Sequence, residues 1–258
     1  MDNYKKYLKS KNLKNSTIKN YLWHVRQFLH WLNNKKATAS ELKNYFKYLL
    51  KKYQKINTIN LRLKIINNYL HFIHQQFQFD LLSDHNLELK ILDNEILNQF
   101  LENPLKKNSH LALRDKALLE LLYHSGLKVG RLIEVKKQQV DDIRQELFLS
   151  KNNSIYLSPH VWMHLKKYLD SRHDDIDYLF INFDRSNKSK NKSLSVRSVE
   201  RIISQYSKNI KPAVNINPQI LRNTLAYQLK STGAQSEHIK AALHFQTRAG
   251  AKNYLKKI

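Results

Sequence analysis

The chain has 258 residues, which is enough to bury the hydrophobic core of one large domain or of two smaller ones. Apolar residues make up 41% of it, which excludes a wholly disordered chain, and the lack of cysteine excludes disulfides and thiolate zinc sites. The net charge of +24 indicates an anionic partner, because a compact protein with so much charge of one sign repels itself. Nucleic acid is the first candidate for that partner, and an anionic membrane surface is the second.

Two observations bear on where the protein works. The residues Met1–Lys6 lack the apolar stretch of a secretory signal peptide. No run of about 18 apolar residues occurs that could cross a bilayer. We therefore expect a soluble cytoplasmic protein that does not contact a membrane.

The positive charge is concentrated near the N-terminus. Residues 1–80 carry 16 Lys and Arg side chains but only 3 Asp and Glu side chains, a net charge of +13. More than half of the total charge therefore lies in less than a third of the chain. This asymmetry predicts a separate N-terminal module that binds an anion.

That module is predicted to contain four helices. Apolar residues recur in it with the helical period of 3.6, and Lys and Arg fill the positions between them. The first helix is expected over residues 2–12, and the second begins near Ser16 and Thr17, which can cap it. The third follows Ser40, and the fourth begins near Thr58.

The segment Phe79–Leu92 breaks the helical period and is more acidic, so it is predicted to be a linker. We place the linker at 81–92, between an N-terminal domain at 1–80 and a C-terminal domain at 93–258. Helices are then expected over Asn94–Leu101 and Leu111–Ser125.

Short alternating runs follow, at Glu146–Ser150 and Ser154–Ser158, and the paired Asn152 and Asn153 between them favour a tight hairpin turn. Tyr178–Ile181 is a candidate third strand, and the lysine-rich Asn182–Ser193 is expected to be a loop. Helices fill the remainder, including Ser195–Lys208 and Pro218–Thr232, where Pro218 suits a first turn and Gly233 a C-terminal cap. The fold class is thus mainly α with a small antiparallel β-sheet.

Three motifs in the C-terminal part resemble the tyrosine recombinase family, which includes the phage integrases and the Xer recombinases. The run Arg114–Lys128 resembles the helix that leads to the first catalytic arginine of that family. Leu221–Ala226 resembles the second arginine motif. Ala242–Phe245, followed by Tyr254, resembles the closing motif with its nucleophile. The resemblance covers nearly the whole chain and implies a four-helix, SAM-like core-binding domain followed by a catalytic-type domain.

The resemblance implies a transesterification that needs no metal and no cofactor. A tyrosine oxygen attacks a phosphate of double-stranded DNA and forms a 3′-phosphotyrosine bond, which is later rejoined to a DNA strand. Guanidinium groups suit the negative charge that gathers on the phosphate oxygens in the transition state. A lysine protonates the departing 5′ oxygen, and histidines assist by hydrogen bonding and proton transfer.

Carried over by position, the resemblance assigns the nucleophile to Tyr254, the second arginine to Arg222 and the lysine of the hairpin turn to Lys151. Helical spacing puts Gln219 on the same face as Arg222.

Three positions depart from the family pattern. Lys128 stands where the first arginine is expected. Gln219 stands where a histidine is expected, and Phe245 stands where a histidine or a tryptophan is usual. His244, one residue before Phe245, could substitute for the missing ring nitrogen, and Arg131 could supply the missing guanidinium.

These departures leave two hypotheses open for the function of the same fold. The first is a recombinase that cleaves and rejoins DNA through Tyr254 at a reduced rate. The second is a catalytically inactive DNA-binding or accessory protein that acts with itself or with a related active recombinase. A basic protein of the membrane surface is a more distant third. His71 and His74 have the spacing of a metal-binding pair, but the sequence offers no evident third ligand.

Overall fold

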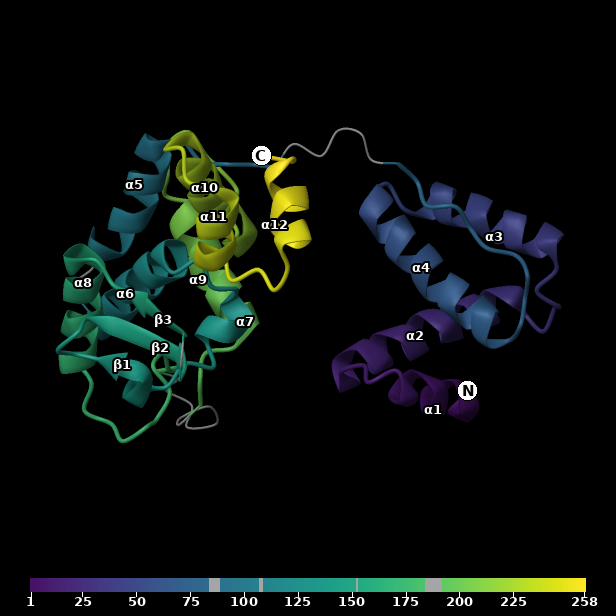
Figure 1. The fold of residues 1–258 in the computed structure, drawn as a ribbon, viewed down its shortest axis with the longest axis horizontal. Coiled ribbons are helices and arrows are strands. Elements are labelled where there is room, and N and C mark those ends of the chain that lie inside the picture. The colour runs from purple at the N-terminus through teal and green to yellow at the C-terminus, as the bar shows by residue number, and fades with distance from the viewer. Residues whose placement is uncertain (84–88, 107–108, 152, 184–191) are drawn as a thin grey trace. The chain divides into compact units, whose positions relative to one another are not determined.

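The computed structural model describes all residues except 84–88, 107–108, 152 and 184–191. Contacts divide the chain into two compact units, Met1–Leu87 and Glu88–Ile258. In the described residues, helices predominate and one antiparallel sheet is present, which confirms the predicted fold class (Figure 1). No helix in the described parts of the chain is both long enough and apolar enough to cross a membrane.

The first unit is a helical bundle around one apolar core. Its helices are α1 (Asp2–Ser10), α2 (Asn15–Leu32), α3 (Ala39–Lys52) and α4 (Ile56–Phe72). The predicted cap of α2 was wrong: the helix begins at Asn15, so Ser16 and Thr17 lie inside its first turn and no side chain caps it. In α3 the capping side chain is Thr38, which accepts a hydrogen bond from the Glu41 backbone N–H.

The chain that leaves α4 packs back onto the bundle. Asn67 exchanges two hydrogen bonds of 2.8 Å with the backbone of Phe79, and Asn60 exchanges two of 2.8 Å with the backbone of Leu82. The Phe79 ring is buried in the core of the first unit. These four bonds fix the first residues after the bundle, where the sequence had shown only a loss of helical period.

The second unit surrounds helix α6 (His110–His124), which packs against three α-helices and one 3-10 helix of the described residues. Ser109 caps α6 by accepting a hydrogen bond from the Ala112 backbone N–H. The other elements of the unit are α5 (Asn94–Glu102), η1 (Asn103–Lys106), α7 (Val129–Leu132), η2 (Lys137–Gln139), β1 (Val140–Asp141), β2 (Glu146–Ser150), β3 (Asn153–Tyr156), α8 (Pro159–Asp170), α9 (Val196–Ser207), α10 (Pro218–Ser231), α11 (Ser236–Ala242) and α12 (Arg248–Leu255).

The sheet has the order β1-β2-β3, and all its pairs are antiparallel. The hairpin of β2 and β3 was predicted, but the third strand was misplaced. Val140–Asp141 supplies it, whereas Tyr178 and Ile181 form only isolated bridges, with Lys136 and Ser193. Of the predicted Asn152–Asn153 turn, Asn152 lies outside the described residues, as does most of the predicted loop at 182–193.

Helix α6 also buries charges that its sequence pattern did not reveal. Nε and Nη2 of Arg114 both donate to Asp115 Oδ1, and the Tyr206 hydroxyl donates a hydrogen bond of 2.9 Å to Oδ2 of the same carboxylate. On another face, Lys116 lies 2.8 Å from Glu120. Buried charges need such partners, because an unpaired charge away from water is costly. The charges that a surface helix would show to solvent are here part of the interior.

Candidate functional site

Helix α10 supplies two neighbouring polar side chains of the candidate site, Gln219 and Asn223. Asn217 caps the helix by accepting a hydrogen bond from the Ile220 backbone N–H, and Pro218 fills the first helical position. One turn separates Gln219 from Asn223, and the Gln219 amide donates a hydrogen bond of 2.9 Å to Asn223 Oδ1. The first turns of α10 therefore present a prearranged polar group.

Arg222 joins three segments of the second unit. Its side chain is buried, with one Nη donating to the carbonyl of Gly126 and the other to the carbonyl of Leu243. The guanidinium carbon lies 5.2 Å from the ring centre of Phe245, within range of a cation–π contact. Burial lowers the pKa of Arg222, and the nearby Tyr254 opposes that shift. The group still stays charged, because arginine does not lose its proton in proteins.

A glycine makes this arrangement possible. Gly126 has a φ of +59°, a region that side-chain-bearing residues rarely adopt. A Cβ at this position would lie 2.3 Å from the carbonyl oxygen of Ala242. The turn after α6 can therefore approach the end of α11 only without a side chain, and that approach places the Gly126 carbonyl against Arg222.

Tyr254 projects from α12 onto the polar group of α10. Its hydroxyl donates a hydrogen bond to Asn223 Oδ1 and accepts one of 3.0 Å from Gln219 Nε2. Its ring lies 5.2 Å from that of Phe245. Burial raises the pKa of Tyr254, while the Arg222 charge and the Gln219 hydrogen bond act in the opposite direction. The phenol is thus held in place, protonated, beside a guanidinium.

His244 lies at the end of α11 in a left-handed conformation, with a φ of 51°. Its Nε2 is 2.9 Å from the carbonyl oxygen of Ser125, so this nitrogen carries the proton that it donates. Burial lowers the pKa of His244, although the hydrogen bond to Ser125 opposes that shift. The neutral ring thus forms a second link between α11 and the turn after α6.

The structure therefore brings four of the six predicted site residues together: Gln219, Arg222, His244 and Tyr254. Lys128 lies two residues beyond Gly126, with its backbone at the N-terminus of α7 and its side chain exposed. Lys151 is exposed at the turn after β2, and within the described residues no hydrogen bond or ion pair joins it to Tyr254 or Arg222.

Two further positions bear on the site. Asn223 was not predicted from the sequence. Its position next to Arg222, as a polar residue on a buried helix face, could have marked it as a site residue. Arg131, considered as a substitute guanidinium, is exposed, and its Nη1 lies 3.8 Å from Glu134 Oε2.

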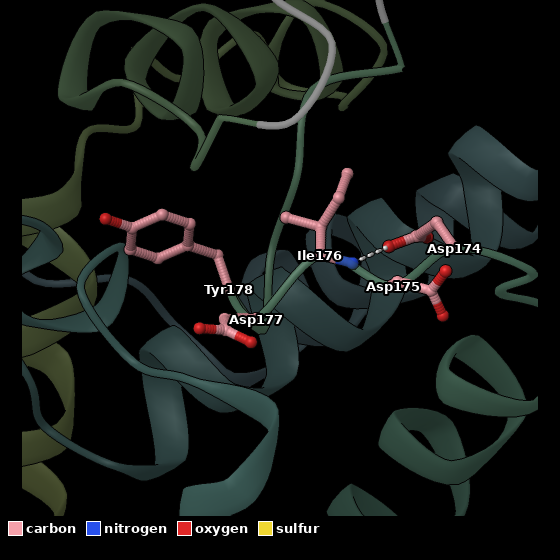
Figure 2. Close-up of a pocket in the computed structure, with 5 residues that line it drawn as sticks. All are labelled: Asp174, Asp175, Ile176, Asp177 and Tyr178. Carbon is pink, nitrogen blue, oxygen red and sulfur yellow. Dashed lines mark hydrogen bonds between the residues drawn. The ribbon is translucent and has the colours of Figure 1, made fainter.

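A hollow on this unit, apart from the Tyr254 site, has the wrong charge for an anion. Asp174, Asp175 and Asp177 line it, together with Ile176 and Tyr178 (Figure 2). Asp174 forms an ion pair with Arg172 and accepts a hydrogen bond of 3.0 Å from the Ile176 backbone N–H. These contacts fold the loop, and the three carboxylates would repel a phosphate.

Comparison with known proteins agrees with the geometry. A profile described as the phage integrase family matches residues 90–257, and one described as the N-terminal SAM-like domain of phage integrases matches residues 1–77. Tyrosine recombinase XerA of Thermococcus kodakarensis is 24% identical over 99% of this chain and 90% of its own length. XerA of Pyrococcus horikoshii is 28% identical over 65% of this chain. The chain spans 60% of the length of that second relative.

Solved structures show the same fold. The Tn1549 transposon integrase, in complex with circular intermediate DNA, superimposes with a TM-score of 0.77 at 14% identity, covering 97% of this chain and 92% of the integrase. A crystal structure of XerA recombinase gives a TM-score of 0.56 at 22% identity, over 97% of this chain and 90% of the other.

Proposed function

Because the chain belongs to the phage integrase family, we propose that it binds double-stranded DNA and carries out site-specific recombination through Tyr254, at a rate reduced by its substituted site. The observation that carries the proposal is the position of the Tyr254 hydroxyl, held by Gln219 and Asn223 beside the buried Arg222. A protein that only binds DNA has no need of this arrangement.

In the proposed reaction, the Tyr254 oxygen attacks a DNA phosphorus atom and displaces the 5′ oxygen, leaving a 3′-phosphotyrosyl bond. The phenol O–H donates a hydrogen bond to the Asn223 amide oxygen, which orients it but is too weak a base to take up its proton. The proton therefore passes to water as the bond between oxygen and phosphorus forms. Arg222 places positive charge beside the attacking oxygen and would stabilise the charge on the phosphate oxygens. His244 supports this site by fixing the turn after α6.

Two lysines complete the proposed set. Lys128 would bring a positive charge to the phosphate, but without the planar fork of an arginine. Lys151 would protonate the departing 5′ oxygen once the β2–β3 turn meets DNA. Gln219 can donate a hydrogen bond but cannot carry a proton between groups, so it orients Tyr254 and does not act as an acid or base.

The domain boundaries and the setting belong to the same proposal. Residues 1–80, with their excess of 13 positive charges, would bind DNA, and residues 93–258 would catalyse the reaction. Residues 81–92 would link these two domains. DNA is the substrate, further copies of this chain or a related recombinase are the partners on it, and the cytoplasm is the location. The solved Tn1549 complex supports the choice of DNA, because that integrase of the same fold holds it.

A second function is favoured by one specific observation. Arg222 is the single guanidinium at the site among the described residues, and it already donates to two backbone carbonyls. Lys128 cannot replace a bidentate contact. Loss of one preorganised donor typically slows a reaction by about 100- to 1,000-fold. A chain weakened in this way could serve as a DNA-binding accessory to an active recombinase.

A nicked suicide substrate separates the two functions. Genomic fragments captured by the purified chain supply the DNA, and a nick beside the scissile phosphate traps any covalent product. We expect a slowly formed adduct that is resistant to denaturant and that Tyr254→Phe abolishes while duplex binding is retained. The exposed Tyr227→Phe, on α10, serves as the control and should leave the adduct unchanged. Tight binding with no adduct would establish the accessory function.

A further inference from the structure

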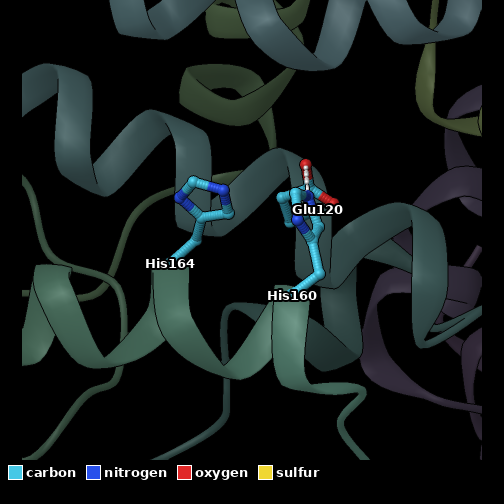
Figure 3. Close-up of side chains that lie close together, drawn as sticks. All are labelled: Glu120, His160 and His164. Carbon is cyan, nitrogen blue, oxygen red and sulfur yellow. Dashed lines mark hydrogen bonds and ion pairs between the residues drawn. The ribbon is translucent and has the colours of Figure 1, made fainter.

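Three side chains with metal-binding atoms meet between α6 and α8, apart from the residues assigned to the DNA chemistry. Glu120 comes from α6, and His160 and His164 lie one turn apart on α8 (Figure 3). One ligand atom from each residue lies within 4.8 Å of the others. The two helices pack directly against each other, so the cluster is fixed by the core of the unit.

Glu120 brings a buried negative charge to this cluster. Its side chain is 1% exposed, and Oε1 lies 3.2 Å from His160 Nε2. Oε2 has no hydrogen-bond partner among the described residues, although His124 Nδ1 lies 3.2 Å away. A buried carboxylate oxygen in this state can still accept a ligand.

Lys116 opposes a cation at this place, because its Nζ is 2.8 Å from Glu120 Oε1. The same ammonium lies 2.6 Å from Glu102 Oε1 and donates to the Leu101 carbonyl at 3.0 Å. The one positive charge of Lys116 is therefore shared between the carboxylates of Glu102 and Glu120, so these three side chains together keep a net negative charge.

We propose that Glu120, His160 and His164 form a site for zinc or a similar divalent transition metal that joins α6 to α8. Two imidazoles and one carboxylate are a donor set that Zn²⁺ uses when it keeps a fourth position for water. Ligand atoms about 2.0–2.1 Å from a tetrahedral ion are about 3.3 Å apart. The 3.2 Å between Glu120 Oε1 and His160 Nε2 already matches this spacing.

Access and completion of the site follow from burial. The His160 side chain is 53% exposed, so an ion can enter from solvent, whereas His164 is buried. A rotation of the His164 ring that brings its nitrogen toward the other two atoms completes the three protein ligands. The metal would tie down α6, whose end leads to the Gly126 turn that holds Arg222.

The test is metal binding by the full chain, which is independent of any DNA chemistry. After treatment with a chelator, the protein is titrated with Zn²⁺ in a calorimeter and with Co²⁺ while the visible absorption is recorded. We expect one equivalent to bind at this site and tetrahedral Co²⁺ bands to appear. We also expect thermal unfolding to shift upward by about 5–10 °C when Zn²⁺ is present at roughly 100 times its dissociation constant.

His160→Ala is the decisive variant, because this exposed side chain can be removed without disturbing the core. Because it removes one of the three protein ligands, it should weaken Zn²⁺ binding at least about tenfold and abolish the Co²⁺ bands. His164→Gln should do the same. The double variant His71→Ala/His74→Ala, which removes an exposed pair on the first unit, is the matched control and should bind as the wild type does.

Two outcomes would overturn the site. One is a wild-type chain that binds no Zn²⁺ and shows no thermal shift. The other is a His160→Ala variant, shown by circular dichroism to be folded, that keeps the wild-type affinity and spectrum. Neither outcome touches the proposal for Tyr254, whose adduct assay contains no metal.

Discussion

In the proposed reaction, Arg222 serves both the architecture of the site and its chemistry. Its hydrogen bonds to the Gly126 and Leu243 carbonyls join the end of α6 to the end of α11, and its charge faces Tyr254 from α12. A phosphate that enters the site meets a guanidinium whose position is already fixed. Preorganisation of this kind costs nothing at the moment of reaction.

The Gly126 turn offers a direct test of this architecture. We expect Gly126→Ala to lower the free energy of unfolding by about 2–4 kcal/mol, because it combines a strained φ with a clash against the Ala242 carbonyl. Gly130→Ala is the matched control: it lies in α7 with no atom within 4 Å of the new Cβ, so stability should stay equal or rise slightly. Urea unfolding of both variants measures the difference. Equal effects would contradict the close approach.

Lys128 tests whether the missing fork limits the chemistry. We expect Lys128→Arg to raise the rate of Tyr254 adduct formation by about tenfold or more, because arginine can bind a phosphate through two parallel hydrogen bonds. Lys136→Arg, at a lysine 3.5 Å from Asp177, is the control and should leave the rate unchanged. The quantity measured is the single-turnover rate on the nicked substrate. An unchanged rate for Lys128→Arg would place the limitation elsewhere.

At the scale of elements, a histidine of α2, His24, is buried close to an arginine of α4, Arg62. His24 is 7% exposed and its ring lies 4.7 Å from that of Trp23. Arg62 from α4 stacks over Trp23 and over Tyr53, at 5.5 and 4.3 Å. Burial, and then the Arg62 charge, lower the pKa of His24 to about 4. The folded first unit therefore prefers the neutral imidazole.

This preference predicts a loss of stability in acid. The unfolded chain takes up the proton near pH 6.5 but the folded chain only near pH 4, so stability is full above pH 6.5 and falls as the pH drops toward 4. We expect a His24 contribution on the order of 1–3 kcal/mol. In urea unfolding across this pH range, His24→Gln should remove that part of the decline. His30→Gln, at an exposed position of α2, should retain it. Parallel curves for His24→Gln and the wild type would contradict the assignment.

At the scale of the whole molecule, the distribution of charge is the dominant feature. Residues 1–80 carry a net charge of +13, whereas the longer remainder of the chain carries +11, and two ion pairs of α6 lie in its interior. A protein that binds DNA through many phosphate contacts releases counterions, so its affinity depends on salt more than on any single lysine.

We therefore expect duplex affinity to fall by about 10³- to 10⁵-fold between 50 and 200 mM salt, the range typical of six to ten phosphate contacts. Fluorescence anisotropy with a labelled duplex measures the slope. Anionic liposomes are the comparison, because a protein of the membrane surface would bind them in competition with DNA. Salt-independent DNA binding, or a preference for liposomes, would contradict a phosphate-contacting function.

The sequence by itself determined the family, the helical class, the charge asymmetry and most element positions. These properties are local: a period of 3.6, a capping residue or a motif can be recognised without knowing what it packs against. The hairpin and α10 follow from such signals, and so does the position of Tyr254 in the closing motif. The same logic failed for the third strand, since pairing of Val140–Asp141 with β2 depends on partners brought together by folding.

Only the tertiary structure decided how the candidate residues meet. That Asn223 holds the Tyr254 hydroxyl, that Arg222 binds two distant carbonyls and that Gly126 must lack a side chain all rest on contacts between residues far apart in the chain. The burial of Glu120 between α6 and α8 is of the same kind. Sequence patterns report how a segment prefers to fold, whereas hydrogen bonds and ion pairs between segments depend on where the completed core places them.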